Sequence, residues 1–142
     1  MATNNVFSYT EGLAEFWTLS ATTDSGVPVL SISKQPAITL TGTGDFVKSE
    51  VLGTYTVSGI PAGGVGLEGK EASIATDGTW KLNVTGGTVT TPQNTLVYMV
   101  ESTGALTLTV GSAPVNATYG KVNYPKGGIR VAGVLPVKIG KF

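Results

Sequence analysis

The spacing of the apolar residues constrains this chain more than any other feature, because it favours strands throughout. No segment of about ten or more residues carries an apolar stripe with the 3.6-residue period of a helix. Instead, about ten short β-rich runs follow one another, with turn residues between them. The pattern predicts an all-β fold: a small β-barrel or sandwich of short antiparallel strands with an extended N-terminal arm.

The clearest pair of predicted strands forms a hairpin at the centre of the fold. Leu96–Val100 and Leu106–Val110 flank a short link that contains Gly104. The second run alternates leucine or valine with threonine, which is typical of a half-buried strand. The first run is apolar on both faces, so we expect it to lie inside the sheet. Gly104 can adopt the positive φ that a tight link needs.

A second hairpin is predicted around Asp77-Gly78, the strongest short turn signal in the chain. Its strands would be Glu71–Thr76 and Thr79–Thr85. In the second strand, tryptophan, leucine and valine alternate with polar residues, so Trp80 is expected in the core.

Single glycines and prolines predict further strand boundaries. Pro28 cannot donate to a ladder, so its strand should start there or lie at a sheet edge. Gly120 is expected to mark a bulge or a close backbone approach. The last segment, Ile129–Ile139, is expected to form two strands broken at Gly133 and at Pro136.

Composition excludes several classes of chemistry. The chain has 142 residues and contains no cysteine and no histidine, so it lacks thiolate ligands and the commonest general base. We therefore expect no enzyme, no cofactor and no metal site. Formal net charge is zero and the nine basic residues are scattered singly along the sequence, which argues against nucleic-acid or membrane partners. Charged residues make up only 13%, which indicates that part of the surface is buried against another molecule.

One glycine-rich motif has the form of a dinucleotide-binding loop. Gly64, Gly66 and Gly69 match G-x-G-x-x-G, but the motif binds phosphate only between a strand and a helix. Because strands are predicted after it, we interpret it as a permissive loop. Glu68 and Glu71, on either side of Lys70, are interpreted as a solvated turn.

The N-terminal region is expected to form an arm, residues 1–20, ahead of a β-barrel-like domain, residues 21–142. It shows neither a secretory signal pattern nor a membrane span. Val6, Phe7 and Tyr9 follow a polar start with little apolar sequence around them. Two interpretations remain open: they form the first strand of the barrel, or they are anchors of an extended arm that docks on a partner.

Three further aromatic residues are candidate interface positions. Phe16 and Trp17 are adjacent, so a strand over Leu13–Leu19 would direct them to opposite faces and expose one ring. A single helical turn is the other possibility for this segment. Phe142, at the end of the sequence, is either tied into the core or an interface anchor.

The order of four stretches resembles a known family. These stretches are S-G-V-P-V-L at Ser25–Leu30, the hairpin Leu96–Thr107, N-A-T-Y-G-K-V at Asn116–Val122 and V-L-P-V-K-I-G at Val134–Gly140. In this order, over about residues 25–140, the chain is similar to the lambda-like head-decoration (capsid-stabilising, cement) proteins of tailed bacteriophages.

The resemblance implies a structural role in a virion. Members of that family bind the outside of an expanded phage head as trimers, contact the major capsid protein and stabilise the shell against internal DNA pressure. The N-terminal arm commonly makes the capsid contact, which here would involve Val6, Phe7 and Tyr9. The protein would be made in the host cytoplasm and would end on the outer surface of the capsid.

An alternative function from another class is a glycan- or protein-binding β-module of a phage tail or cell-surface protein. Exposed aromatic rings on a β-sandwich can stack on sugars. Trp17, Tyr55 and Tyr124 are the candidates for that role.

Overall fold

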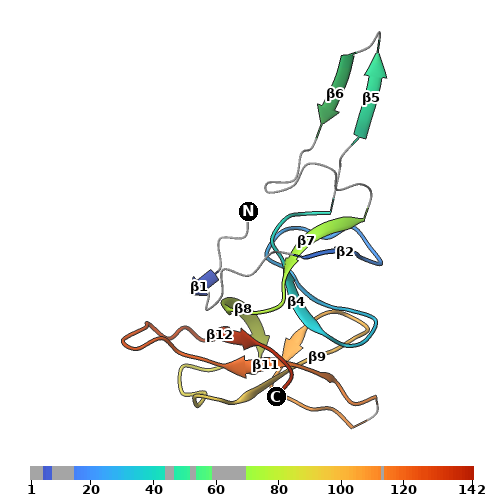
Figure 1. Ribbon diagram of the computed structural model, residues 1–142. Helices are drawn as coiled ribbons and strands as arrows, with labels where there is room; N and C mark the ends of the chain where they lie inside the picture. The colour runs from blue at the N-terminus through green and yellow to red at the C-terminus, as the bar shows by residue number, and fades with distance from the viewer. Residues whose placement is uncertain (1–4, 8–14, 44–46, 52–53, 59–69, 113) are drawn as a thin grey trace. The chain divides into compact units, whose positions relative to one another are not determined.

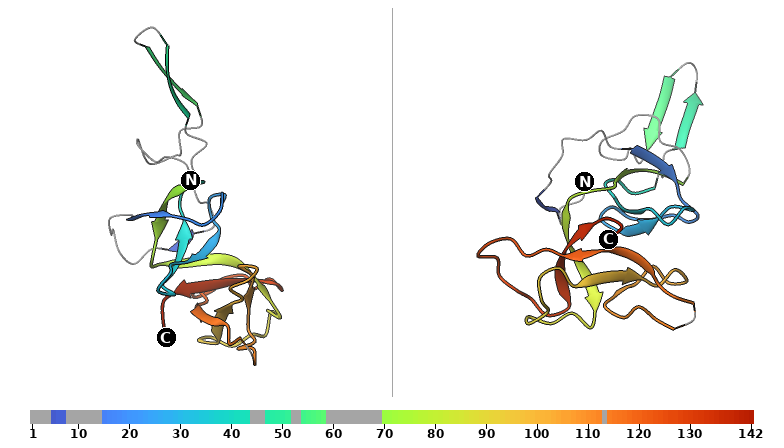
Figure 2. Two further views of the ribbon diagram at one scale, coloured as in Figure 1. Left: turned by 90° about the vertical axis from the view of Figure 1, so that its right-hand side faces the viewer. Right: turned by 60° about the horizontal axis from the view of Figure 1, so that its bottom comes forward.

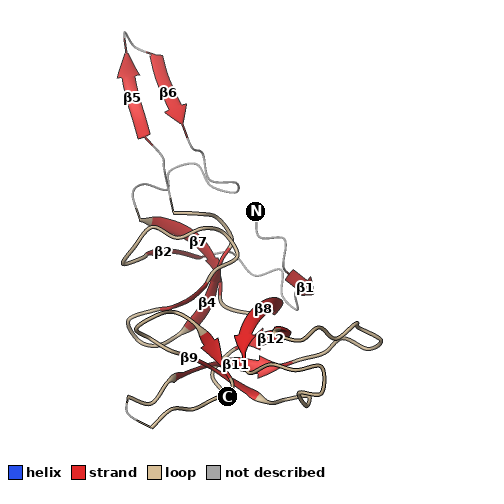
Figure 3. Ribbon diagram, turned by 180° about the vertical axis from the view of Figure 1, so that it is seen from behind, coloured by secondary structure: helices blue, strands red, loops and turns tan. Residues whose placement is uncertain are grey.

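In the described part of the chain, the computed structural model contains strands and no helix (Figures 1 and 3). The described residues are 5–7, 15–43, 47–51, 54–58, 70–112 and 114–142. The predicted all-β class is therefore confirmed. The strands are β1 Asn5–Phe7, β2 Glu15–Thr18, β3 Pro28–Leu30, β4 Pro36–Thr39, β5 Val47–Val51, β6 Thr54–Ser58, β7 Glu71–Ala75, β8 Thr79–Thr85, β9 Leu96–Met99, β10 Leu106–Thr107, β11 Ala117–Val122 and β12 Val134–Ile139.

Five strands close into a small barrel. The largest sheet has the order β1-β8-β10-β9-β11-β12, and a further pairing of β12 with β8 completes the circle. The strands coloured yellow to red in Figure 2 form this barrel. All of its pairs are antiparallel except β10 with β8, which run parallel. Because the barrel is closed, its strands have no long free edge at which a strand of another chain could pair and cause aggregation.

The predicted central hairpin is present but shorter than expected. Leu106 lies opposite Met99 in an antiparallel pair, and Gly104 in the link has φ +72°. β9 lies inside the sheet between β10 and β11, as predicted. Its apolar residues are buried on one face only, since Leu96 is exposed. Val110 is exposed as well, because β10 ends at Thr107 and the chain turns away.

The second predicted hairpin is wrong. β7 pairs with β2 and β4, whereas β8 belongs to the barrel. Asp77-Gly78 forms a bend that leads from one sheet to the other. Both edges of β8 are already occupied, one by β12 and the other by β1 and β10, so no edge is left for β7. The face assignment is confirmed: Trp80 is 3% exposed, and its Nε1 donates to the Asp77 carbonyl at 2.9 Å.

Gly120 fulfils both predictions made for it. The pairing of β11 with β9 shifts register between Thr118 and Gly120, which is a bulge. A Cβ at Gly120 would also collide with the backbone carbonyl oxygen of Lys138 on β12. Only glycine allows the two barrel strands to approach this closely.

The expected break at Pro136 is wrong, because β12 runs through it from Val134 to Ile139. The Pro136 carbonyl accepts from the Asn123 N–H at 2.8 Å. The backbone polar positions of Pro136 therefore face the β11 side. Asn123 follows the last residue of β11. The missing N–H of Pro136 therefore falls at the end of that ladder, where its loss is tolerated.

The barrel core contains one buried polar side chain of note. Tyr119 on β11 is fully buried, and its hydroxyl donates to the Ala37 carbonyl at 2.7 Å. Burial raises the pKa of the Tyr119 hydroxyl well above its ordinary value. The surrounding core is apolar and comprises Trp80, Leu82, Val84, Val97, Met99, Leu106, Val122, Leu135, Val137 and Ile139.

A second sheet has the order β2-β7-β4-β3. Its strand β4 is buried along its whole length. β3 begins at Pro28 and lies at the sheet edge, as the proline predicted. β5 and β6 pair with each other as a separate antiparallel two-stranded sheet.

The chain divides into two compact units that interleave along the sequence. One comprises residues 1–3, 12–27 and 38–75, and the other comprises residues 4–11, 28–37 and 76–142. The expected division into an arm, residues 1–20, and a domain, residues 21–142, stays a prediction, because much of that arm lies outside the described residues.

Candidate interaction surface

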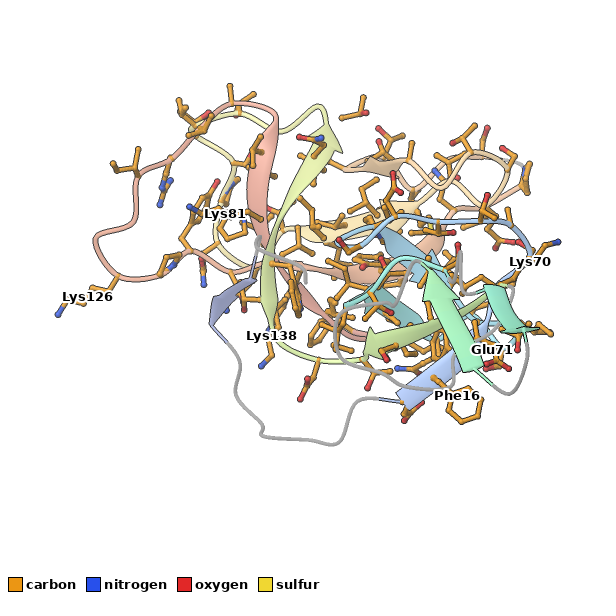
Figure 4. All side chains as sticks on the ribbon, turned by 90° about the horizontal axis from the view of Figure 1, so that it is seen from above. Phe16, Lys70, Glu71, Lys81, Lys126 and Lys138 are labelled. Carbon is orange, nitrogen blue, oxygen red and sulfur yellow. The ribbon has the colours of Figure 1, made fainter. Side chains whose placement is uncertain are left out.

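The edge strand β2 presents an aromatic side chain to solvent. Among the described strands, β2 is the outermost of its sheet, and it pairs with β7. Phe16 is 65% exposed, and Figure 4 shows its ring projecting away from the strand. Trp17 is half-buried, and its Nε1 donates to Glu15 Oε2 at 3.1 Å. An exposed ring on a sheet edge combines an aromatic anchor with backbone groups available for strand addition.

Phe142 lies on the surface. Its side chain is 51% exposed, and the Nζ of Lys121 stands 4.7 Å from the centre of its ring. This cation–π contact holds the ring beside β11 without burying it. Of the two interpretations left open by the sequence, the surface position is the one observed, and a role in an interface stays a prediction.

The residues expected in the N-terminal arm lie partly on a barrel strand. Val6 and Phe7 belong to β1, which pairs with β8 through Asn5 opposite Trp80 and Phe7 opposite Thr79. Tyr9 lies outside the described residues. β1 therefore joins the barrel sheet, but the circle closes without it. Contact of these residues with a capsid stays a prediction.

Arg130 and Gln93 both contact Tyr124. The Arg130 guanidinium lies 4.1 Å from the centre of the Tyr124 ring, and Gln93 Oε1 accepts from the Tyr124 backbone N–H at 2.7 Å. Arg130 therefore occupies one face of the ring that a sugar would need for stacking. The side chain of Tyr55 lies outside the described residues.

The barrel brings together three lysines that are far apart in sequence. Lys121 on β11 lies directly opposite Lys138 on β12. Lys81 on β8 lies opposite Pro136, two residues from Lys138 and on the same face. We call these three residues the lysine row; Figure 4 labels two of them. Sequence reasoning missed this row, because the nine basic residues are scattered singly and only strand register assembles them.

Within the described ranges, no group of three or more acidic residues is placed to hold a metal ion. Nor does the described part include a helix long and apolar enough to cross a membrane. The glycine motif at Gly64, Gly66 and Gly69 lies outside the described residues, as does Glu68. Lys70, next to that loop, is exposed and donates to the Ser20 carbonyl at 2.9 Å.

Comparison of the chain with family models, with curated proteins and with solved structures found no match.

Proposed function

We propose that this protein is a capsid decoration protein, which binds the outside of an expanded phage head as a homotrimer and stabilises the shell against internal DNA pressure. The resemblance that suggests this role rests on four stretches. The observation that supports it is the position of three of them, Leu96–Thr107, Asn116–Val122 and Val134–Gly140, on neighbouring paired strands of one barrel, from β10 through β9 and β11 to β12. The fourth, Ser25–Leu30, ends in β3 of the other sheet.

The exposed edge of β2 offers a physical means of attachment. Burial of Phe16, which is 65% exposed, would remove apolar surface from water, and the edge backbone could pair with a strand of the major capsid protein. Each copy would contribute a modest interface, and many copies on one shell would act together.

Co-sedimentation with expanded, undecorated capsids tests the proposal. We expect saturable binding at a multiple of three copies per three-fold position and a raised melting temperature of the shell. Phe16→Ser should weaken the affinity for the shell at least about tenfold, because loss of an aromatic hot spot costs about 2 kcal/mol or more. Ile129→Ser is the matched control: Ile129 is 93% exposed on a loop, so occupancy should be unchanged. Absence of pelleting would contradict the proposal.

The same experiment addresses the alternative of a glycan-binding module. Failure to pellet, together with glycan binding that Trp17→Ala abolishes, would replace the capsid role with that function. The contact between Arg130 and the Tyr124 ring argues against a sugar platform at Tyr124.

A further inference from the structure

Three exposed aliphatic side chains gather where two loops of the barrel meet. Val89 lies in the loop between β8 and β9, and Ile129 and Val131 lie in the loop between β11 and β12. Their exposed fractions are 48%, 93% and 53%. Arg130 Nη1 donates to the Val89 carbonyl at 3.3 Å, which brings the two loops together at these residues. We call Val89, Ile129 and Val131 the aliphatic tip. Exposed apolar side chains that gather in this way mark an interaction surface.

Backbone hydrogen bonds hold the two loops in place. The Gly133 N–H donates to the Gly87 carbonyl at 3.0 Å, which joins the two loops near the barrel. The Gly128 N–H donates to the Pro125 carbonyl at 3.0 Å and closes the turn next to Ile129. The loop between β11 and β12 stands out from the barrel (Figure 1). A tip that is already ordered loses little conformational entropy when it binds.

The charged side chains beside the aliphatic tip are basic. Lys126 and Arg130 are exposed in the loop between β11 and β12, and Figure 4 shows Lys126 at its outer end. Neither loop contains an acidic residue, and residues 102–142 as a whole contain none. The Arg130 guanidinium lies over the Tyr124 ring and uses one donor on Val89, so further donors remain for an anion. This surface is therefore complementary to a partner that is both anionic and apolar.

The composition and shape of this surface favour a lipid bilayer over a protein. Valine is under-represented among the residues that dominate protein interfaces. Side chains on a projecting loop do not enclose a protein segment, but they can enter the boundary between lipid headgroups and acyl chains. Basic side chains next to them would then meet the phosphates of an anionic membrane surface.

We infer that the aliphatic tip inserts into the surface of an anionic lipid bilayer, with Lys126 and Arg130 at the headgroup phosphates. The expectation of no membrane partner rested on the net charge of the whole chain, which is zero, whereas these two loops carry only positive charge. The contact goes beyond the proposed function and does not depend on it, because no capsid component takes part.

Sedimentation of the full-length protein with phospholipid vesicles tests the inference. We expect binding to vesicles made of equal amounts of phosphatidylglycerol and phosphatidylcholine, and binding at least about tenfold weaker to phosphatidylcholine alone. Binding to the anionic vesicles should weaken between about 0.05 M and about 0.5 M salt, because screening shortens the reach of surface charges. Ile129→Ser should weaken it at least about tenfold, because the most exposed aliphatic side chain of the tip is lost. Lys126→Glu should remove most of the preference for anionic vesicles.

Ile32→Ser is the matched control for the serine variant. Ile32 is fully exposed on the turn between β3 and β4, in the same compact unit but outside the aliphatic tip, so vesicle binding should be unchanged. Ile129→Trp gives a second test that unfolding cannot imitate. It should bind at least as tightly as the unmodified protein, and its fluorescence should shift to shorter wavelength with vesicles, because tryptophan favours the membrane interface. Circular dichroism checks the fold of each variant.

Three results would overturn the inference: no sedimentation with either kind of vesicle at low salt, equal binding to both kinds, or an equal loss in Ile129→Ser and Ile32→Ser. Loss of shell occupancy in Ile129→Ser, with no vesicle binding, would assign the tip to the capsid instead. The vesicle assay contains no capsid. Failure of the protein to pellet with shells would therefore remove the proposed function and leave this inference in place.

Discussion

Gly120 is the residue at which the barrel leaves least room. A Cβ there would meet the Lys138 carbonyl oxygen, which belongs to the backbone of β12 and cannot rotate away. Gly120→Ala should therefore lower the free energy of unfolding by about 2–3 kcal/mol, measured by urea denaturation. Gly42→Ala is the control, since its new Cβ would make an ordinary contact of 3.5 Å with the Thr23 carbonyl oxygen. Equal stability of the two variants would contradict the close approach.

Tyr119 contributes a buried hydrogen bond to the same region. Tyr119→Phe would leave the Ala37 carbonyl without this donor and should lower the free energy of unfolding by about 1–2 kcal/mol near pH 7. Because burial raises the pKa of Tyr119 above 10.0, the unfolded chain loses this proton first as the pH rises. The stability that neutral Tyr119 contributes is complete below about pH 10 and falls above it.

The cost of Tyr119→Phe should therefore shrink at alkaline pH, since phenylalanine cannot ionise in either state. Urea denaturation of both proteins at about pH 8 and about pH 11 measures this difference. A cost that is constant or grows with pH would show that Tyr119 ionises at least as easily in the folded protein as in the unfolded chain.

At the scale of elements, β8 determines how the barrel is assembled. It pairs with β12 along one edge and with β1 and β10 along the other. The barrel closes through the pairing of β8 with β10 and with β12. β1 adds to the edge of β8 but is not needed to close the barrel. This arrangement makes the contribution of β1 separable from the fold.

Deletion of residues 1–9 should leave the barrel folded and cost about 1–2 kcal/mol, because only a few backbone hydrogen bonds are lost. Circular dichroism and urea denaturation measure the effect, with deletion of residues 1–4 as the control that keeps β1. If the arm makes the capsid contact, the longer deletion should also abolish shell binding. Unchanged shell occupancy by the truncated protein would refute the arm assignment.

At the scale of the whole molecule, most of the buried apolar side chains among the described residues belong to the barrel. Buried apolar residues in the four-stranded sheet are Ala37, Ile38, Ala72 and Ile74, whereas the others lie between Trp80 and Ile139. Strands such as β11 and β12 also have a paired neighbour on each side, which β2 lacks in the described part of its sheet. Local stability should therefore differ between the two sheets.

Hydrogen exchange measures that difference. We expect the amides of β8, β11 and β12 to exchange slowest, with free energies of opening near the global value, and those of β2 to exchange faster. Uniform protection across β2 and the barrel strands would indicate one cooperative unit and contradict the expectation.

Much of the local structure could be predicted from the sequence. Period-2 alternation is a property of the strand itself, so it correctly placed Trp80 in the core. Proline and glycine restrict or widen the backbone conformations available within a few residues. Pro28 therefore predicted the start of an edge strand, and Gly120 predicted a bulge with a close backbone approach. Pro136 was misjudged because its effect depends on where the neighbouring strand ends.

The strand class and the inward position of side chains such as Trp80 follow from local sequence, because they depend on local steric limits and apolar periodicity. Which strands pair is a property of the folded chain alone. Asp77-Gly78 is a strong hairpin signal, yet β8 pairs with β12, some fifty residues away along the chain, because apolar burial in a closed barrel outweighs a local turn preference. The same long-range register brings Lys81, Lys121 and Lys138 onto one face, which no local pattern could reveal.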